Sequence, residues 1–126
     1  IINCIKKNVA IWNINSFAEY YMQIFGKYQN CYIEACYQFI KERERFQKEM
    51  NKVSFVRVIP SQANFFMIEL TGRYTSNELS SILLKRFNIL IKSCNTKHGL
   101  ENKNYIRIAV RNRIDNDRLI DALNSL

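Results

Sequence analysis

The sequence predicts a single α+β domain with two layers, in which helices pack on a small, mostly antiparallel sheet. With 126 residues, the chain is long enough for one domain with its own core and too short for two. Apolar residues recur every three to four positions before Val53, and short β-branched segments follow it. The expected order is helix, helix, strand, strand, helix, strand, strand, helix. Because strands and helices do not alternate strictly, a doubly wound parallel sheet is disfavoured.

The first part of the chain is predicted to be helical after an irregular lead-in over residues 1–15. Ser16 to Glu19 has the S-x-x-E form of a capping box, so a short helix is predicted to begin there and to end near Gly26. A second, longer helix is predicted over residues 30–51, with a charged and solvated outer face. Its apolar positions follow a three-to-four spacing: Ile33, Cys36, Ile40, Phe46 and Met50.

Four short segments rich in apolar and β-branched residues predict strands: 53–59, 63–70, 89–92 and 105–111. Pro60 ends the first of them. The second is apolar on both faces as far as Glu69, which is typical of a strand covered on both sides. Residues 93–103 are polar and contain Gly99, so they are predicted to form a loop.

Two further helices are predicted in the second half of the chain. Thr75 to Glu78 forms another capping box, and Asn88 suits the left-handed conformation that ends a helix. The last helix is predicted to begin near Ile114. The residues expected to face inward from these two helices are Leu79, Ile82, Leu83, Phe87, Leu119, Ile120, Leu123 and Leu126.

The composition narrows the class of protein. No apolar run approaches the roughly 20 residues that a membrane span needs, so no membrane association is expected. The net charge of +8 indicates either binding to nucleic acid or another anionic surface, or simply a solvated basic surface. Because the chain begins with Ile1 rather than Met, we expect it to be a segment of a longer protein.

The cysteines and the single histidine do not have the spacing of a metal site. A zinc site needs four such ligands in paired spacings, and no C-x-x-C pair occurs, so we expect no metal. Scattered cysteines are typical of buried thiols in a reducing compartment, which predicts a cytoplasmic location. The residues in question are Cys4, Cys31, Cys36, Cys94 and His98.

The last predicted strand carries the residue best suited to bind an anion. Two sets of side chains alternate along it, namely Ile106, Ile108 and Val110 against Tyr105, Arg107, Ala109 and Arg111. Because the first set must meet the helices, Arg107 points to the other side, where its planar fork matches a carboxylate or phosphate. Lys92 would add a second positive charge if its strand pairs with this one. The alternatives are a structural arginine in a surface ion pair and an exposed lysine at a strand end.

Three segments carry a resemblance to a known family. Trp12-Asn-Ile-Asn-Ser16 precedes a helix, Pro60-Ser-Gln-Ala-Asn-Phe65 opens a strand, and residues 88–123 contain Ile-Leu-Ile-Lys-Ser-Cys and Tyr-Ile-Arg-Ile-Ala-Val-Arg. They are similar to P-W-x-V-N-S, P-S-x-A-N-F, I-L-I-R-D-C and Y-I-R-V-A-V-R. Together they resemble the C-terminal small domain of class I/II, fold-type I aminotransferases that use pyridoxal 5′-phosphate (PLP). Within that family they are similar to histidinol-phosphate aminotransferase and threonine-phosphate decarboxylase.

The resemblance implies which residues bind substrate. Arg107 lies where the family's arginine grips the substrate's carboxylate or phosphate, and Lys92 lies where a second anion-binding arginine is usual. Ser93 stands in place of the usual aspartate. The family's Schiff-base lysine belongs to the large domain. We therefore expect no catalytic or cofactor-binding residue in this chain, and residues 1–29 are expected to be the connecting segment from the large domain.

The resemblance also implies the partners. We expect PLP to be bound in the full-length enzyme and not by this chain alone. The chain would bind the substrate's anion and close over the cleft, and it would be inactive by itself. The implied partners are the missing large domain, a second copy in a homodimer and a small amino or phosphate substrate of a biosynthetic reaction, without nucleic acid. Transamination and decarboxylation are both open.

Two alternatives come from other functional classes. The first is a basic α+β module that binds RNA on its sheet by stacking bases on Phe65, Phe66 or Tyr105. Against it, the chain lacks the K/R-G-F/Y-G/A-F-V-x-F/Y strand motif and begins with helices. The second is a structural or interaction domain that has lost catalysis.

Overall fold

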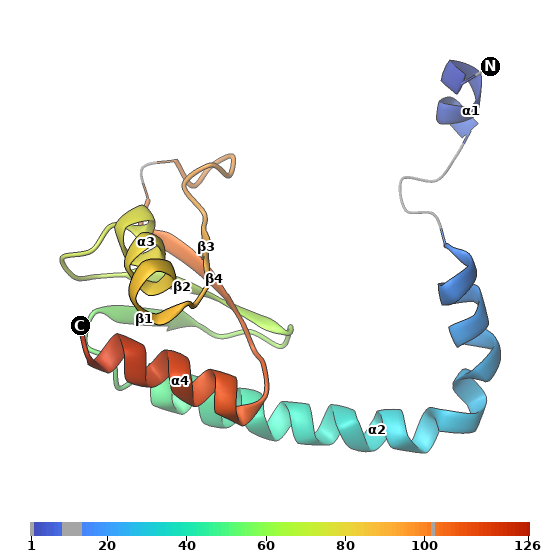
Figure 1. Ribbon diagram of the computed structural model, residues 1–126, viewed down its shortest axis with the longest axis horizontal. Helices are drawn as coiled ribbons and strands as arrows, with labels where there is room; N and C mark the ends of the chain where they lie inside the picture. Colours follow the sequence, from blue (N-terminus) through green and yellow to red (C-terminus); the bar gives the residue numbers. More distant parts are fainter. Residues whose placement is uncertain (1, 9–13, 102) are drawn as a thin grey trace. The chain divides into compact units, whose positions relative to one another are not determined.

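The computed structural model describes residues 2–8, 14–101 and 103–126. Their elements, in chain order, are α1 (Ile2–Asn8), α2 (Ser16–Met50), β1 (Val56–Ile59), β2 (Phe65–Leu70), α3 (Ser76–Phe87), β3 (Lys92–Ser93), β4 (Tyr105–Ala109) and α4 (Arg113–Asn124) (Figure 1). The chain divides into two compact units, Ile1–Cys36 and Tyr37–Leu126. α2 begins in the first unit and ends in the second.

α2 is one continuous helix where two were predicted. The predicted break after Gly26 is absent because no proline interrupts residues 16–50, and a single glycine weakens a helix by only about 1 kcal/mol relative to alanine. The predicted cap is also wrong by one residue. The Ala18 amide donates to Asn15 Oδ1 at 2.9 Å, so Asn15 caps the helix and Ser16 already lies inside it.

The region predicted as an irregular lead-in contains the short helix α1. Trp12, which opens the first family-like motif, lies outside the described residues. The side chains of α1 and of the first turns of α2 are largely exposed.

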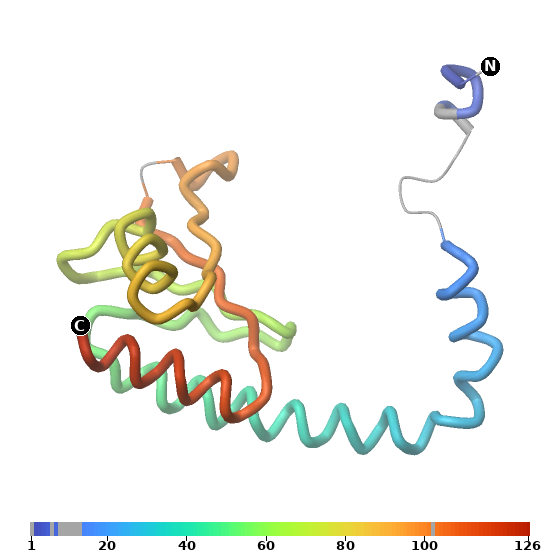
Figure 2. The backbone as a smooth tube through the Cα atoms, in the orientation of Figure 1, coloured from blue at the N-terminus to red at the C-terminus, as the bar shows by residue number. Residues whose placement is uncertain are grey.

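The second unit is built on a four-stranded sheet with the order β1-β2-β4-β3. Every neighbouring pair of strands is antiparallel, which confirms the predicted fold class (Figures 1 and 2). β3 is much shorter than the predicted strand 89–92. The amides of Asn88 and Ile89 bond back to the carbonyls of α3, so the chain leaving that helix is not yet available to the sheet.

The helix ends around α3 follow the prediction. Thr75 and Glu78 form the capping box: the Thr75 amide donates to Glu78 Oε2 at 2.9 Å, and the Glu78 amide donates to Thr75 Oγ1 at 3.3 Å. The bond from the Thr75 amide, followed by one that the Thr75 hydroxyl donates to Glu78 Oε2 at 2.8 Å, holds the pKa of Glu78 below its ordinary value. Asn88 has φ 54° and ends the helix in the left-handed conformation.

The core lies between one face of the sheet and three helices. The second half of α2 contributes Phe46 and Met50, and the Phe46 ring lies 5.9 Å from that of Phe66 in β2. α3 and α4 cover the same face with apolar side chains, the fully or nearly fully buried ones being Leu79, Leu83, Leu119, Ala122 and Leu123. α2 packs beside α4, since Arg45 and Asp117 form an ion pair of 2.7 Å between them.

The other face of the sheet is open within the second unit, as far as its residues are described. Burial alternates along β1, β2 and β4, so every second side chain points away from the helices. The prediction that β2 is covered on both faces is therefore wrong here: Phe65 is 37% exposed, and Met67 and Glu69 are half-buried. Phe66, by contrast, is completely buried, so it cannot stack on a nucleic-acid base.

Candidate anion-binding site

The open sheet face carries both residues that the sequence marks as anion-binding candidates. Its side chains come from alternate positions of the four strands: Arg57, Ile59, Phe65, Met67, Glu69, Lys92, Tyr105, Arg107 and Ala109. Arg107 lies in the middle of β4, which is a central strand flanked by β2 and β3. Its backbone is therefore fixed from both sides.

Lys92 and Arg107 are directly opposite each other in the pairing of β3 with β4. Residues opposite each other in an antiparallel pair project from the same face, with Cβ atoms about 5 Å apart. The condition set by the sequence, that the two strands pair, is thus met. Like charges in this arrangement repel each other, and an anion placed between them relieves the repulsion.

Neither cation is neutralised by the described residues. In the described part of the chain, neither side chain makes a hydrogen bond or an ion pair, and both residues are exposed. The guanidinium of Arg107 does have one neighbour, since its Cζ lies 5.3 Å from the centroid of the Phe65 ring. The alternative of a structural arginine in a surface ion pair is therefore not supported among these residues.

A second pair of charged residues lies on the same face, and its two members neutralise each other. Arg57 and Glu69 are opposite each other in the pairing of β1 with β2, and their side chains form an ion pair. The pKa of Arg57 is raised, mainly by its hydrogen bond to the Glu69 carboxylate and next by the charge of that carboxylate. Glu69 is thus already neutralised, and the net positive charge of the face comes from Arg107 and Lys92.

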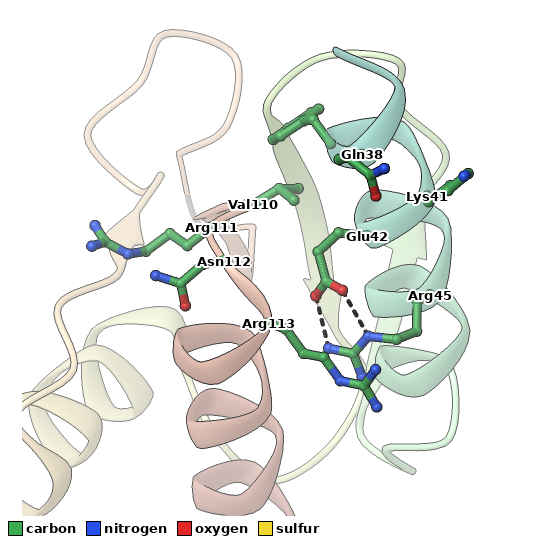
Figure 3. A pocket seen from close by; sticks show the side chains of 9 residues that line it. Gln38, Lys41, Glu42, Arg45, Val110, Arg111, Asn112 and Arg113 are labelled. Atoms are coloured by element: carbon green, nitrogen blue, oxygen red, sulfur yellow. Dashed lines mark hydrogen bonds and ion pairs between the residues drawn. The ribbon is translucent and has the colours of Figure 1, made fainter. Parts of the chain in front are cut away.

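A cavity of about 610 Å³ lies elsewhere, between α2 and the segment that joins β4 to α4 (Figure 3). Its Glu42 accepts from Arg45 Nε at 2.8 Å and from Asn116 Nδ2 at 2.8 Å. The Arg45 bond, followed by the Asn116 bond, lowers the pKa of Glu42 although burial opposes it. Arg111 points away from this pair and binds Asp115 at 2.7 Å. This cavity is lined by charges that hold α2 and α4 together.

Asn116 is a residue that the sequence analysis missed. It is 2% exposed, its side chain accepts from the Arg111 amide at 3.0 Å, and it donates to the Arg111 carbonyl at 2.9 Å. These bonds hold the backbone of Arg111 between the end of β4 and Asn112, which caps α4. The signal was an asparagine on the inner face of an amphipathic helix, where a polar side chain needs partners.

Other sequence candidates prove to be peripheral. His98 is fully exposed and lies 3.5 Å from Glu101. Of the cysteines expected to be buried, only Cys94 is buried, whereas Cys4 and Cys31 are exposed. In the described ranges, no group of three or more histidine, cysteine or acidic side chains could hold a metal ion. No helix among these residues is long and apolar enough to cross a membrane.

Comparison with known proteins identifies the family. The sequence profile of "Aminotransferase class I and II" matches residues 2–123, almost the whole chain. The chain belongs to this family.

Individual members of the family are similar over much of the chain. L-serine phosphate decarboxylase from Sulfurospirillum multivorans is 35% identical over 127 residues, which cover 99% of this chain and 32% of that protein. Histidinol-phosphate aminotransferase from Aquifex aeolicus is 33% identical over 91 residues, which cover 72% of this chain and 24% of that protein. The chain thus spans about a third or less of these aminotransferase-family proteins.

Solved structures of the family share the fold. A decarboxylase from Sulfurospirillum multivorans has a TM-score of 0.82 and 35% identity, covering 98% of this chain and 35% of that one. Histidinol-phosphate aminotransferase from Clostridium acetobutylicum has a TM-score of 0.80 and 34% identity, covering 97% and 37%. Aminotransferases and decarboxylases of this family therefore both contain the arrangement described here.

The family depends on PLP, which an enzyme holds through a lysine. Such a lysine reacts because a pocket desolvates it or a neighbouring cation lowers its pKa. Every lysine side chain that the structure describes is exposed, including Lys92 beside Arg107. The described residues therefore offer no desolvated lysine for PLP.

Proposed function

We propose that this chain is the substrate-anion-binding domain of a PLP-dependent aminotransferase or amino-acid-phosphate decarboxylase. The observation that carries the proposal is the pair formed by Lys92 and Arg107, directly opposite on the open sheet face and without an anionic partner among the described residues. Family membership and the similarity to serine phosphate decarboxylase and histidinol-phosphate aminotransferase support it.

The two cations suit different anionic groups. Arg107 has a planar fork of N–H donors that matches a carboxylate in two parallel hydrogen bonds. Lys92 is a point charge on a flexible stem, which accepts a tetrahedral phosphate or phosphonate without a fixed orientation. A small substrate that carries both groups, such as an amino acid phosphate, would bridge the pair. This assignment covers the transaminase and the decarboxylase alternatives alike.

The rest of the enzyme supplies the cofactor. A large domain outside this chain binds PLP, and the open sheet face turns toward the cleft between the two domains. When the cleft closes, Arg107 and Lys92 orient the substrate and water is displaced from it. The working enzyme is a cytoplasmic homodimer, and the chain alone is inactive. The partly exposed Phe65 and Met67 on the sheet face support this placement, because closure would cover them.

The decisive experiment replaces Arg107 in the enzyme that contains both domains. Losing one partner of a desolvated charge pair costs about 2–5 kcal/mol, so Arg107→Ala should lower kcat/KM by about 30-fold to several thousand-fold. Arg107→Lys should recover only part of this loss because lysine cannot form the fork. Arg86→Ala is the control, since Arg86 also lies over an aromatic ring, on α3, 5.3 Å from the Phe87 centroid. Normal turnover by a folded Arg107→Ala enzyme would refute the proposal.

A second experiment tests whether the chain acts alone. The 126-residue chain is incubated with PLP, reduced with borohydride and digested, and the peptides are analysed by mass spectrometry. We expect only scattered, substoichiometric labelling of exposed lysines. Stoichiometric attachment to one lysine would show that the chain itself holds the cofactor, and the assignment of roles would then be wrong.

A further inference from the structure

The geometry of the open sheet face points to a positioning residue, and we infer that Phe65 holds the Arg107 guanidinium in the orientation that binds the substrate's anion. This inference rests on the proposed function of Arg107. The inference adds to that function a reason why the exposed Arg107 side chain is already oriented to bind an anion.

Arg107 and Phe65 form a cation–π contact on the open sheet face. The Arg107 Cζ atom lies 5.3 Å from the centroid of the Phe65 ring, within the roughly 6 Å over which a guanidinium is attracted to an aromatic face. The two residues come from neighbouring strands. Phe65 is directly opposite Ala109, so it is the diagonal neighbour of Arg107, at a distance that an aromatic side chain reaches.

The residues beside the contact of Arg107 with Phe65 differ in size and charge. Ala109 is the next residue after Arg107 on this face of β4 and is opposite Phe65, and its side chain is only a methyl group. Met67 is directly opposite Arg107 on one side, and Lys92 is directly opposite on the other. On this face Arg107 therefore has an apolar residue and a cation as its cross-strand neighbours, an aromatic ring beside its guanidinium, and no ion pair with a carboxylate among the described residues.

The aromatic contact leaves the hydrogen-bond donors of Arg107 free of the ring. The five N–H donors of a guanidinium lie in its plane, whereas a ring attracts it without occupying them. The contact with Phe65 thus restricts the rotamers of Arg107 and leaves every N–H group available for an anion. An ion pair would restrict the side chain equally well, but it would occupy the fork that the substrate needs.

Exposure supports the same role. Phe65 is 37% exposed, while the adjacent Phe66 is completely buried in the core. The Phe65 ring adds little to the core, so its removal should leave the core intact.

The molecule provides a matched control. Arg86 lies over Phe87 at the same distance, 5.3 Å, on α3 rather than on the open sheet face. If aromatic contacts of this kind were only structural, Phe65→Leu and Phe87→Leu would have equivalent effects on anion binding.

The contact is tested by NMR of the arginine Nε–H groups in the enzyme that contains both domains. We expect ring-current shifts for Arg107 and Arg86, with the Arg107 signal identified by its loss in Arg107→Lys. Phe65→Leu should move only the Arg107 signal, and Phe87→Leu only the Arg86 signal. An Arg107 signal that stays in place in Phe65→Leu would overturn the inference.

The functional consequence is tested with O-phospho-L-serine as the probe, by calorimetric measurement of its Kd. Phe65→Leu should raise the Kd by about 3- to 20-fold, as expected for losing a partly desolvated cation–π contact. Phe65→Tyr keeps the ring and should stay within about twofold of the parent, as should Phe87→Leu. The Tm of Phe65→Leu should remain close to that of the parent.

A double-mutant cycle separates this inference from the proposed function. In the Arg107→Gln background, Phe65→Leu should change the Kd by less than about twofold, because the residue it positions is gone. If Arg107→Gln alone left the Kd unchanged, the proposed function would fail. If Arg107→Gln weakened binding while Phe65→Leu had no effect, or the same effect in both backgrounds, only the positioning role of Phe65 would fail.

Discussion

Arg107 and Lys92 carry the same charge but are held differently. Arg107 is fixed in the middle of a central strand, with neighbouring strands on both sides. Lys92 begins a two-residue strand at the edge of the sheet. The arginine is therefore preorganised and the lysine is not, so the two should contribute unequally to binding.

Replacing Lys92 should increase stability and weaken substrate binding. Lys92→Gln removes a like-charge pair directly across two strands, so it should raise the free energy of unfolding by about 0.2–1 kcal/mol at low salt. The gain should vanish near 1 M salt, where charges are screened within about 3 Å. The same variant should lower kcat/KM by about tenfold, less than Arg107→Ala does. Denaturation at two salt concentrations and steady-state kinetics check this, with Lys85→Gln on α3 as the control.

Glu42 should make stability depend on pH in the acid range. Its pKa is lowered, mainly by Arg45, from an ordinary value of 4.5, so its stabilising contribution is present above that pH and is lost as the pH falls further. Glu42→Gln should destabilise the protein by about 1 kcal/mol at neutral pH, since Arg45 is only partly buried. The difference in Tm between parent and variant should shrink below pH 4.5.

Thermal melts between neutral and acid pH measure this difference. Glu44→Gln, which replaces an exposed carboxyl on the same helix, is the control and should follow the parent throughout. A parent–variant difference that widened toward acid pH would contradict the assigned direction of the pKa shift.

At the level of helices and strands, local signals were predicted well. The Thr75–Glu78 capping box, the left-handed Asn88 and the alternation that turns Arg107 to the open face each depend on neighbours in the sequence. The pairing of Lys92 with Arg107 depends on the register between two strands, which the sequence could only state as a condition. The contact of Phe65 with Arg107 could not be predicted either, because it crosses two strands on a diagonal.

The predictions failed where two local signals compete and where burial depends on more than this chain. Ser16 and Asn15 are both good capping residues, and the structure uses Asn15. β2 was expected to be covered on both faces because Phe65 and Met67 are apolar, yet the helices cover only one face in the described chain. On the proposed function, Phe65 and Met67 line the cleft of the enzyme. They are apolar because another part of the enzyme, outside this chain, covers them.

Two glycines should respond in opposite ways to the same substitution. Gly26 lies inside α2, and a Cβ added there would have no atom within 4 Å, so Gly26→Ala should stabilise the helix by about 0.5–1 kcal/mol. At Gly72 an added Cβ would lie 2.5 Å from Phe55 Cβ, so Gly72→Ala should destabilise the protein by about 1–3 kcal/mol. Far-UV circular dichroism and urea denaturation measure both effects. A stabilising Gly72→Ala would show that the turn before α3 adjusts freely.

At the level of the whole molecule, the first unit exposes many large apolar side chains. Those on α2 before residue 36 are Phe17, Tyr20, Tyr21, Met22, Tyr28, Tyr32 and Ile33. Ordinary soluble monomers scatter such residues singly rather than gathering them on one element. We therefore expect this helix to be covered in the complete enzyme.

The isolated chain should self-associate through this helix. Sedimentation velocity should show an average mass that rises with concentration. Phe17→Glu combined with Tyr21→Lys should bring it closer to the 15.0 kDa of the monomer. The second unit should keep its urea midpoint, because both residues lie outside its core. A chain that stayed monomeric at millimolar concentration would show that the exposed residues do not drive association.

β3 has only two residues, so little of the sheet fixes the position of Lys92. Residues 94–101 and 103–104 follow it before β4 begins, and the pairing with β4 places Lys92 opposite Arg107. Insertions or replacements there would move the second charge relative to Arg107 without disturbing the core. On the proposed function, selectivity for longer or shorter dianionic substrates would then diverge by changes at this edge of the sheet alone, while the proposed contact of Arg107 with the carboxylate stays constant. Exchanging residues 92–104 between homologues, with the buried Cys94 kept, should transfer chain-length preference and leave folding unaffected.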